Sequence, residues 1–218
     1  MANSKQIAEK APHVLHHFVD SDQQFESSKL GMWIFLVTEI LFFGGLFVAY
    51  IVYRALHPEL FIMAAEQLDT TMGAINTAVL IASSLTIAMA IRAAQLNQKR
   101  NLIILLSSTI ALAFTFMVIK YFEYTHKFDL GIYPGSYYTF EGIDHELASV
   151  FFSIYYMMTA LHGIHVVIGI VFIGILVYKA SKDKFSPEYY TPVEITALYW
   201  HLVDIIWIFL FPLLYLID

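Results

Sequence analysis

Five ionisable side chains lie inside long apolar runs of this sequence, where a charge is costly. Glu39 stands in the first run, His162 and His165 stand together in another, and His201 and Asp204 stand in the last. Imidazole and carboxyl groups in such places can hold a metal or a haem, or move protons. Ionisable residues at membrane depth also tend to face other helices and to find polar partners there. Each group therefore has a chemical hypothesis and a structural one.

Glu39 lies about nine residues, or about 14 Å along a helix, past the start of its apolar run. A carboxyl at that depth can act in a proton relay or face lipid. Alternatively, it is a protonated side chain that is hydrogen-bonded to a neighbouring helix. Intramembrane carboxyls are functional hypotheses by default, so the residues alone leave both interpretations open.

The histidine pair has a spacing of three, which places His162 and His165 on one helix face with Gly169. The pair could bind a metal or a haem. A haem needs ligands on facing helices, and His201 is the only other histidine deep in an apolar run. We therefore favour hydrogen bonds inside a helix bundle, with Gly163 and Gly169 allowing close packing.

His201 and Asp204 share a helix face with Trp200 and Trp207, and we expect that face to be buried. A proton relay is one hypothesis for the pair. We favour a structural pair that anchors the last helix to the fourth helix or to a neighbouring subunit.

Two further carboxyls stand near predicted helix ends. Glu194 begins the last helix, where a negative charge suits the helix dipole. Glu123 ends the third helix, where the dipole does not help, so we expect it to pair with His126 or Lys127.

Basic and aromatic side chains near the ends of the runs are candidates for contacts with lipid headgroups, because such belts anchor helices at the membrane surface and can hold phosphate. These candidates are Arg54, Arg92, Lys182, Lys184, Tyr189, Tyr190 and Trp200.

The elements that must position these residues are long apolar helices. The chain of 218 residues is 59% hydrophobic and 14% charged, whereas soluble domains average about 45–50% and about 25%. We expect an all-α integral membrane protein with a polar tail at 1–29 and one membrane domain at 30–218. Its five transmembrane helices are predicted at about 30–53, 73–96, 102–124, 147–178 and 193–217.

Charge patterning predicts the orientation of this bundle. Nine of the 12 lysines and arginines fall on the side of the N-terminus, and cytoplasmic loops hold the excess of such residues. The N-terminus is therefore predicted to be cytoplasmic and the C-terminus periplasmic. The net charge of −6 gives no reason to expect a nucleic-acid partner, and the absence of cysteine excludes thiolate chemistry and cysteine-bound metals.

Three motifs resemble subunit III of the haem-copper respiratory oxidases. They are the Glu39 segment (33–45), the segment Ala-Leu-His-Gly-Ile-His-Val (160–166), and Tyr-Trp-His-Leu-Val-Asp-Ile-Ile-Trp-Ile-Phe-Leu (199–210). The resemblance implies the five-helix bacterial form of a non-catalytic subunit of a proton-pumping oxidase in the inner membrane. It also implies that Glu39 lies near a proton-uptake route.

The same resemblance implies partners and cofactors. The chain would pack directly against subunit I, assemble with subunit II and other respiratory subunits, and bind phospholipid. It would hold no metal and no cofactor of its own, with haem and copper in the partner subunits.

Two alternatives stay open. One is the related accessory subunit of nitric oxide reduction, which shares this fold. The other is a small proton-coupled transporter that uses Glu39, His201 and Asp204.

Overall fold

The protein is a bundle of long helices. The computed structural model describes residues 14–15, 18–143, 145 and 147–217. The long helices are α1 (Ser21–Leu56), α3 (Thr70–Gln95), α4 (Lys99–Asp129), α5 (Ala148–Ser181) and α6 (Thr191–Tyr215). A short helix α2 (Pro58–Ala65) and a single 3-10 turn η1 (Gly135–Tyr137) lie in connections. In this described part of the chain, the five long helices are each long and apolar enough to cross a membrane, which confirms the predicted five-helix, all-α class.

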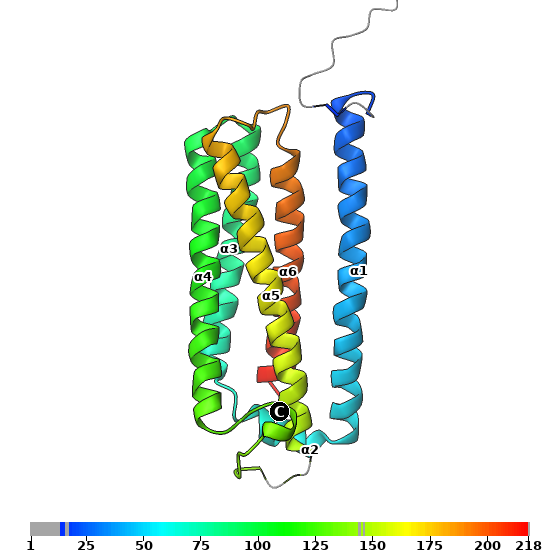
Figure 1. Cartoon of the computed structure of the whole chain (residues 1–218), viewed down its shortest axis with the longest axis vertical. Helices are drawn as coiled ribbons and strands as arrows, with labels where there is room; N and C mark the ends of the chain where they lie inside the picture. Colours follow the sequence, from blue (N-terminus) through cyan, green and yellow to red (C-terminus); the bar gives the residue numbers. More distant parts are fainter. Residues whose placement is uncertain (1–13, 16–17, 144, 146, 218) are drawn as a thin grey trace, which may run out of the picture.

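Helices α3 to α6 pack together, and α1 stands along the edge of this group beside α6 (Figure 1). α3 and α4 are antiparallel neighbours, as their short connection predicts, and the hydroxyls of Thr86 and Thr109 join them at 2.8 Å. The most apolar 18-residue window of α6 is 56% buried, against 17% for that of α1. α6 is therefore the helix that the others surround, while α1 exposes most of its side chains.

α1 touches the bundle along one narrow stripe. Its buried apolar residues Leu36, Phe43 and Tyr50 recur every seven residues, a spacing that returns to the same helix face after two turns. The Tyr50 hydroxyl donates to the carbonyl oxygen of Leu213 in α6. The stripe and this bond fix the register in which α1 presents Glu39.

Small residues allow the tightest helix contacts. A Cβ atom added to Gly169 of α5 would lie 2.5 Å from the ring of Trp200 in α6, so the prediction that Gly169 permits close packing is confirmed. The same prediction for Gly163 is wrong, because an added Cβ there would meet nothing within 4 Å. Gly163 borders an open hollow instead.

The helix ends differ from the sequence-based boundaries. α1 begins at Ser21, nine residues before the predicted position, because Asp20 caps it by accepting from the backbone N–H of Gln23 at 2.8 Å. The predicted tail at 1–29 is therefore helical from residue 21 onward, and residues 1–13 and 16–17 lie outside the described part. α4 extends to Asp129, five residues beyond the predicted end. Hydropathy locates the apolar part of a helix, not its polar extensions.

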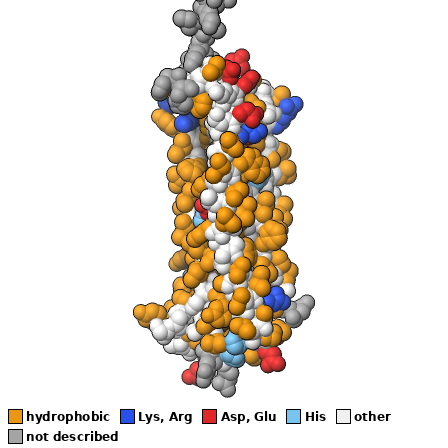
Figure 2. Space-filling view, turned by 90° about the vertical axis from the view of Figure 1, so that its right-hand side faces the viewer, with side chains coloured by type: hydrophobic (Ala, Val, Ile, Leu, Met, Phe, Trp, Pro, Cys, Tyr) orange, Lys and Arg blue, Asp and Glu red, His pale blue; other side chains and the backbone are white. Residues whose placement is uncertain are grey.

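The surface has the polarity of a membrane protein. Figure 2 shows the face that bears α1, with hydrophobic side chains over the middle and charged side chains near the two ends. The described ends of the chain lie at opposite ends of the bundle (Figure 1). An odd number of crossings requires this arrangement, and together these observations make the chain a multi-pass membrane protein.

Candidate functional site

The central polar contact of the α1 side joins Glu39 to His165. The Nε2 atom of His165 in α5 lies 3.0 Å from a carboxyl oxygen of Glu39 in α1. The side chain of His165 is 14% exposed and that of Glu39 is 17% exposed. Both are therefore mostly buried, with a small part at the surface of the chain. Phe43 packs edge-on against the imidazole at 5.2 Å between ring centroids. The two residues are 126 positions apart in the sequence.

The other ring nitrogen of His165 fixes how protons are shared. His165 Nδ1 lies 2.8 Å from the carbonyl oxygen of Leu161, and a carbonyl can only accept, so Nδ1 is the protonated nitrogen. Nε2 then either accepts a proton from the Glu39 carboxyl or donates to its carboxylate. A hydrogen bond between the two groups therefore needs one proton, which either the carboxyl or Nε2 can carry.

His162 points elsewhere. Its ring is fully buried between Phe116 and Trp207, at centroid distances of 5.5 and 5.2 Å. Neither ring nitrogen has a hydrogen-bond partner among the described residues. The expectation that both histidines are hydrogen-bonded is thus right for His165 and wrong for His162. Their rings diverge because three residues of helix leave about 60° between side chains.

His201 and Asp204 do not form the predicted direct pair. His201 Nδ1 lies 2.7 Å from the Ser84 hydroxyl of α3. The buried carboxyl oxygens of Asp204 have no hydrogen-bond partner among the described residues. The contact of His201 is therefore with α3, not with the fourth long helix. The neighbouring Trp200 and Trp207 are buried as expected and donate to Ser83 and Thr77 at 3.0 Å.

A second polar cluster lies inside the bundle around Glu123. Its carboxylate accepts from Lys120 and Lys127 at 2.8 Å each, and from the hydroxyls of Tyr155 at 2.7 Å and Tyr215 at 2.6 Å. The expected pairing with Lys127 is confirmed. The part played by Lys120 was missed, although the spacing 120/123/127 is that of neighbours on one helix face and could have revealed it.

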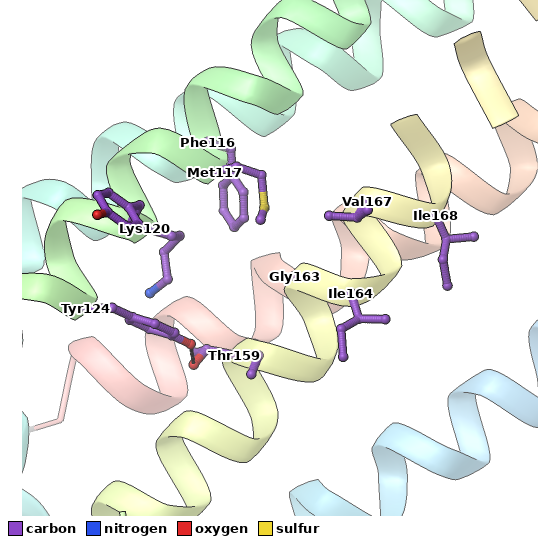
Figure 3. A pocket seen from close by; sticks show the side chains of 11 residues that line it. Phe116, Met117, Lys120, Tyr124, Thr159, Gly163, Ile164, Val167 and Ile168 are labelled. Atoms are coloured by element: carbon purple, nitrogen blue, oxygen red, sulfur yellow. Dashed lines mark hydrogen bonds between the residues drawn. The ribbon is translucent and has the colours of Figure 1, made fainter. Parts of the chain in front are cut away.

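A hollow of about 370 Å³ opens beside this cluster, between α4 and α5. Figure 3 shows the Lys120 amine and the Tyr124 hydroxyl on one side of it and Gly163 with Ile164 on the other. Lys120 already donates to Glu123, Tyr155 and Tyr215, so its three N–H groups are used. One wall of the hollow is therefore apolar. The other wall is polar, but Lys120 has no N–H group left to donate to an occupant.

The carboxyl at the start of α6 forms an ion pair. Glu194 lies 3.3 Å from Lys29 of α1, in the first turn of its helix. This pair ties α1 to α6 at the end of the bundle where both helices begin.

The candidates for lipid contact separate into two groups. Lys182, Lys184 and Tyr189 line a hollow of about 910 Å³ in the α5–α6 connection. Arg54 is half-buried and Arg92 is exposed, and each lies in the last turn of its helix. Trp200 must be removed from the set, because its ring is fully buried against Gly169. Tyr190 is partly buried and packs against Phe25 of α1, with 6.1 Å between ring centroids.

Within the residues that the structure describes, there is no group of three or more His, Asp or Glu side chains that could hold a metal ion. The three histidines at membrane depth point to three different places: α1, the bundle interior and α3.

The sequence matches the model of the family described as cytochrome c oxidase subunit III over residues 5–218. The chain belongs to this family. It is 33% identical over 190 residues to cytochrome c oxidase subunit 3 of Thermostichus vulcanus, covering 86% of each chain.

Two other relatives carry subunit 3 names. Cytochrome c oxidase subunit 3 of Synechocystis is 30% identical over 188 residues, which cover 86% of this chain and 74% of that protein. A probable quinol oxidase subunit 3 of Staphylococcus saprophyticus is 28% identical over 190 residues, which cover 87% and 89%. Family membership is therefore shown. The relatives named as cytochrome c oxidase subunits and the one named as a quinol oxidase subunit have similar sequence identity to this chain.

Proposed function

We propose that this chain is the non-catalytic subunit III of a proton-pumping haem-copper terminal oxidase in a bacterial inner membrane. Its N-terminus faces the cytoplasm, and it packs directly against subunit I, with subunit II and other respiratory subunits in the same complex. Haem and copper belong to those partners, and this chain stabilises subunit I and supports proton uptake. Family membership supports the assignment to an oxidase complex.

The observation that most supports a role in proton uptake is the contact between Glu39 and His165. A carboxyl and an imidazole in hydrogen-bond contact can pass a proton between them with a small movement of charge. The pair lies about 27 Å along α1 from Ser21 by helix rise, and both side chains are partly exposed at the surface of this chain. A proton held there is accessible to a neighbouring polypeptide or to ordered water.

Phospholipid binding is the third part of the proposal. The hollow lined by Lys182, Lys184 and Tyr189 also has Lys179 at its edge, and it lies where α5 ends and α6 begins. Ammonium and phenol groups at a membrane surface suit a lipid phosphate. Asp183, which also lines this hollow, pairs with Lys99 at 2.8 Å.

The assignment to a complex is tested by tagging the chain in its host and extracting it in mild detergent. We expect polypeptides that bind haem and copper to co-purify and to reduce O₂. A complex that reduces nitric oxide instead would replace the proposal with its accessory-subunit alternative. A chain that purifies alone and transports a solute would contradict both.

The role of the shared proton is tested by replacing Glu39→Gln in that complex. We expect normal assembly, with slower proton uptake or faster inactivation during turnover. Replacing His165→Leu should have a similar effect, because it removes the other half of the pair. Glu188→Gln, at an exposed position of the α5–α6 connection, is the matched control. Unchanged uptake and lifetime in both pair variants would remove the role.

A further inference from the structure

A second hollow, separate from the one in Figure 3, lies between α1 and α6. It has a volume of about 570 Å³, and its walls are apolar side chains such as Phe43 and Phe47 of α1 and Phe209 of α6. His201 is the one ionisable side chain among the described residues that line it, and Trp33 stands near one end. Pockets of this size, mostly apolar with few polar groups, are typical of small-molecule sites.

The His201 ring brings an unused polar atom to this hollow. Its Nδ1 is engaged by Ser84 at 2.7 Å, and no described residue forms a hydrogen bond with Nε2. The ring is half-buried. In one tautomer Nε2 donates, and in the other it accepts. A ring nitrogen that faces hydrocarbon without a partner is costly, so an occupant with a carbonyl or hydroxyl group would be stabilised there.

The depth of His201 discriminates between kinds of occupant. It follows Thr191, the first residue of α6, by ten positions, or about 15 Å of helix. The ester carbonyls of phospholipids lie at the edge of a hydrocarbon core about 30 Å thick. His201 is well inside that edge, so a phospholipid can place only its acyl chains beside the ring. A neutral molecule whose polar groups can enter the hydrocarbon region is needed.

The shape of the hollow also limits its occupant. On α1 its lining extends from Trp33 to Ile51, 18 positions or about 27 Å of helix. A volume of about 570 Å³ over that length describes a long open groove along the two helices. A groove of this form suits a molecule with a long hydrocarbon tail and a small flat ring.

We propose that the hollow between α1 and α6 binds a quinone or quinol, with a ring oxygen at His201 Nε2 and the isoprenoid tail along the apolar walls. A quinone carbonyl accepts from Nε2–H, and a quinol hydroxyl donates to the unprotonated nitrogen, so each tautomer of His201 suits one form. The inference concerns binding alone and does not depend on the proposed function, because every contact used lies within this chain.

Tryptophan fluorescence tests it. The purified full chain is placed in phosphatidylcholine nanodiscs and titrated with decylubiquinone, a short-tailed quinone that quenches tryptophan at contact. Trp33 is 55% exposed and lines the hollow, whereas the other two tryptophans are fully buried. We expect saturable quenching that is lost in Trp33→Phe, and binding about tenfold weaker in His201→Phe, the effect of one hydrogen bond.

Two glycines provide a matched pair of variants. Gly44 lines this hollow, and a Cβ atom added there meets nothing within 4 Å; Gly163 is equally open but lines the hollow between α4 and α5. Gly44→Leu should abolish saturable quenching, and Gly163→Leu should leave it unchanged. Circular dichroism and gel filtration of each variant show that it is folded.

Several results would overturn the proposal. Quenching that rises linearly and equally in wild type and Gly44→Leu would mean that the quinone merely dissolves in the bilayer. Equal competition by decylbenzene, which has the same tail and no oxygen, would mean an acyl-chain groove. Release of co-purifying polypeptides by Gly44→Leu, with quenching unaffected, would make the hollow a protein interface.

Discussion

Replacing Glu123→Gln is expected to destabilise the bundle strongly, because this one carboxylate is the ion-pair partner of two buried lysines. The side chains of Lys120, Glu123 and Lys127 are 8%, 2% and 3% exposed. The amide of glutamine has the same shape but no charge, and its NH₂ group cannot accept. Removing one partner of a buried ion pair costs about 3–5 kcal/mol, so we expect the free energy of unfolding to fall by about that amount.

The measurement is unfolding of the purified full chain in mixed micelles by increasing sodium dodecyl sulfate, followed by tryptophan fluorescence and circular dichroism. Glu188→Gln makes the same chemical change at an exposed position and should alter the free energy of unfolding by less than about 0.5 kcal/mol.

A double variant separates charge balance from lost hydrogen bonds. Adding Lys120→Met to Glu123→Gln removes one of the two unpaired cations, so the double variant should be more stable than the sum of the single changes predicts. The reasoning is refuted if Glu123→Gln costs less than about 1 kcal/mol, or if the two changes are simply additive.

Three further predictions concern helix contacts, all measured by the same unfolding assay. Gly169→Leu should cost about 1–3 kcal/mol by overpacking, because its Cβ would lie 2.5 Å from a ring of α6, whereas Gly174→Leu, open within 4 Å, should cost little. Tyr50→Phe removes the only described hydrogen bond from that hydroxyl to α6 and should cost about 1 kcal/mol; an unchanged value would mean that this bond does not hold α1. Lys99→Met breaks an ion pair whose side chains are 45% and 74% exposed, so the loss should stay below about 1 kcal/mol and shrink with added salt.

Hydropathy and a few rare residues determine the class and the helices of this protein. Runs of about 20 apolar residues require helices in a bilayer, because the backbone must satisfy its own hydrogen bonds there. The five predicted spans therefore correspond to α1, α3, α4, α5 and α6. Motifs around Glu39, His162 and His201 indicated the family, and the family comparison agrees.

The partners of the buried polar side chains were decided only by the tertiary structure. Spacing along one helix suggested that His201 would pair with Asp204, whereas His201 bonds to Ser84, 117 positions away. Spacing also grouped His162 with His165, yet His165 meets Glu39, 126 positions away, on a helix that sequence alone could not place beside it.

The physical reason is that a sequence pattern describes one helix, while a buried polar group is satisfied by whichever helix packs against it. Hydropathy indicates which segments enter the membrane. It says little about how each helix is rotated about its axis or which helices are neighbours. That rotation depends on side-chain shape at a few close contacts, such as Gly169 against Trp200. The sequence by itself thus determined the class, the helices and the family, and the packing of α1 against α5 and α6 decided which residues form the site.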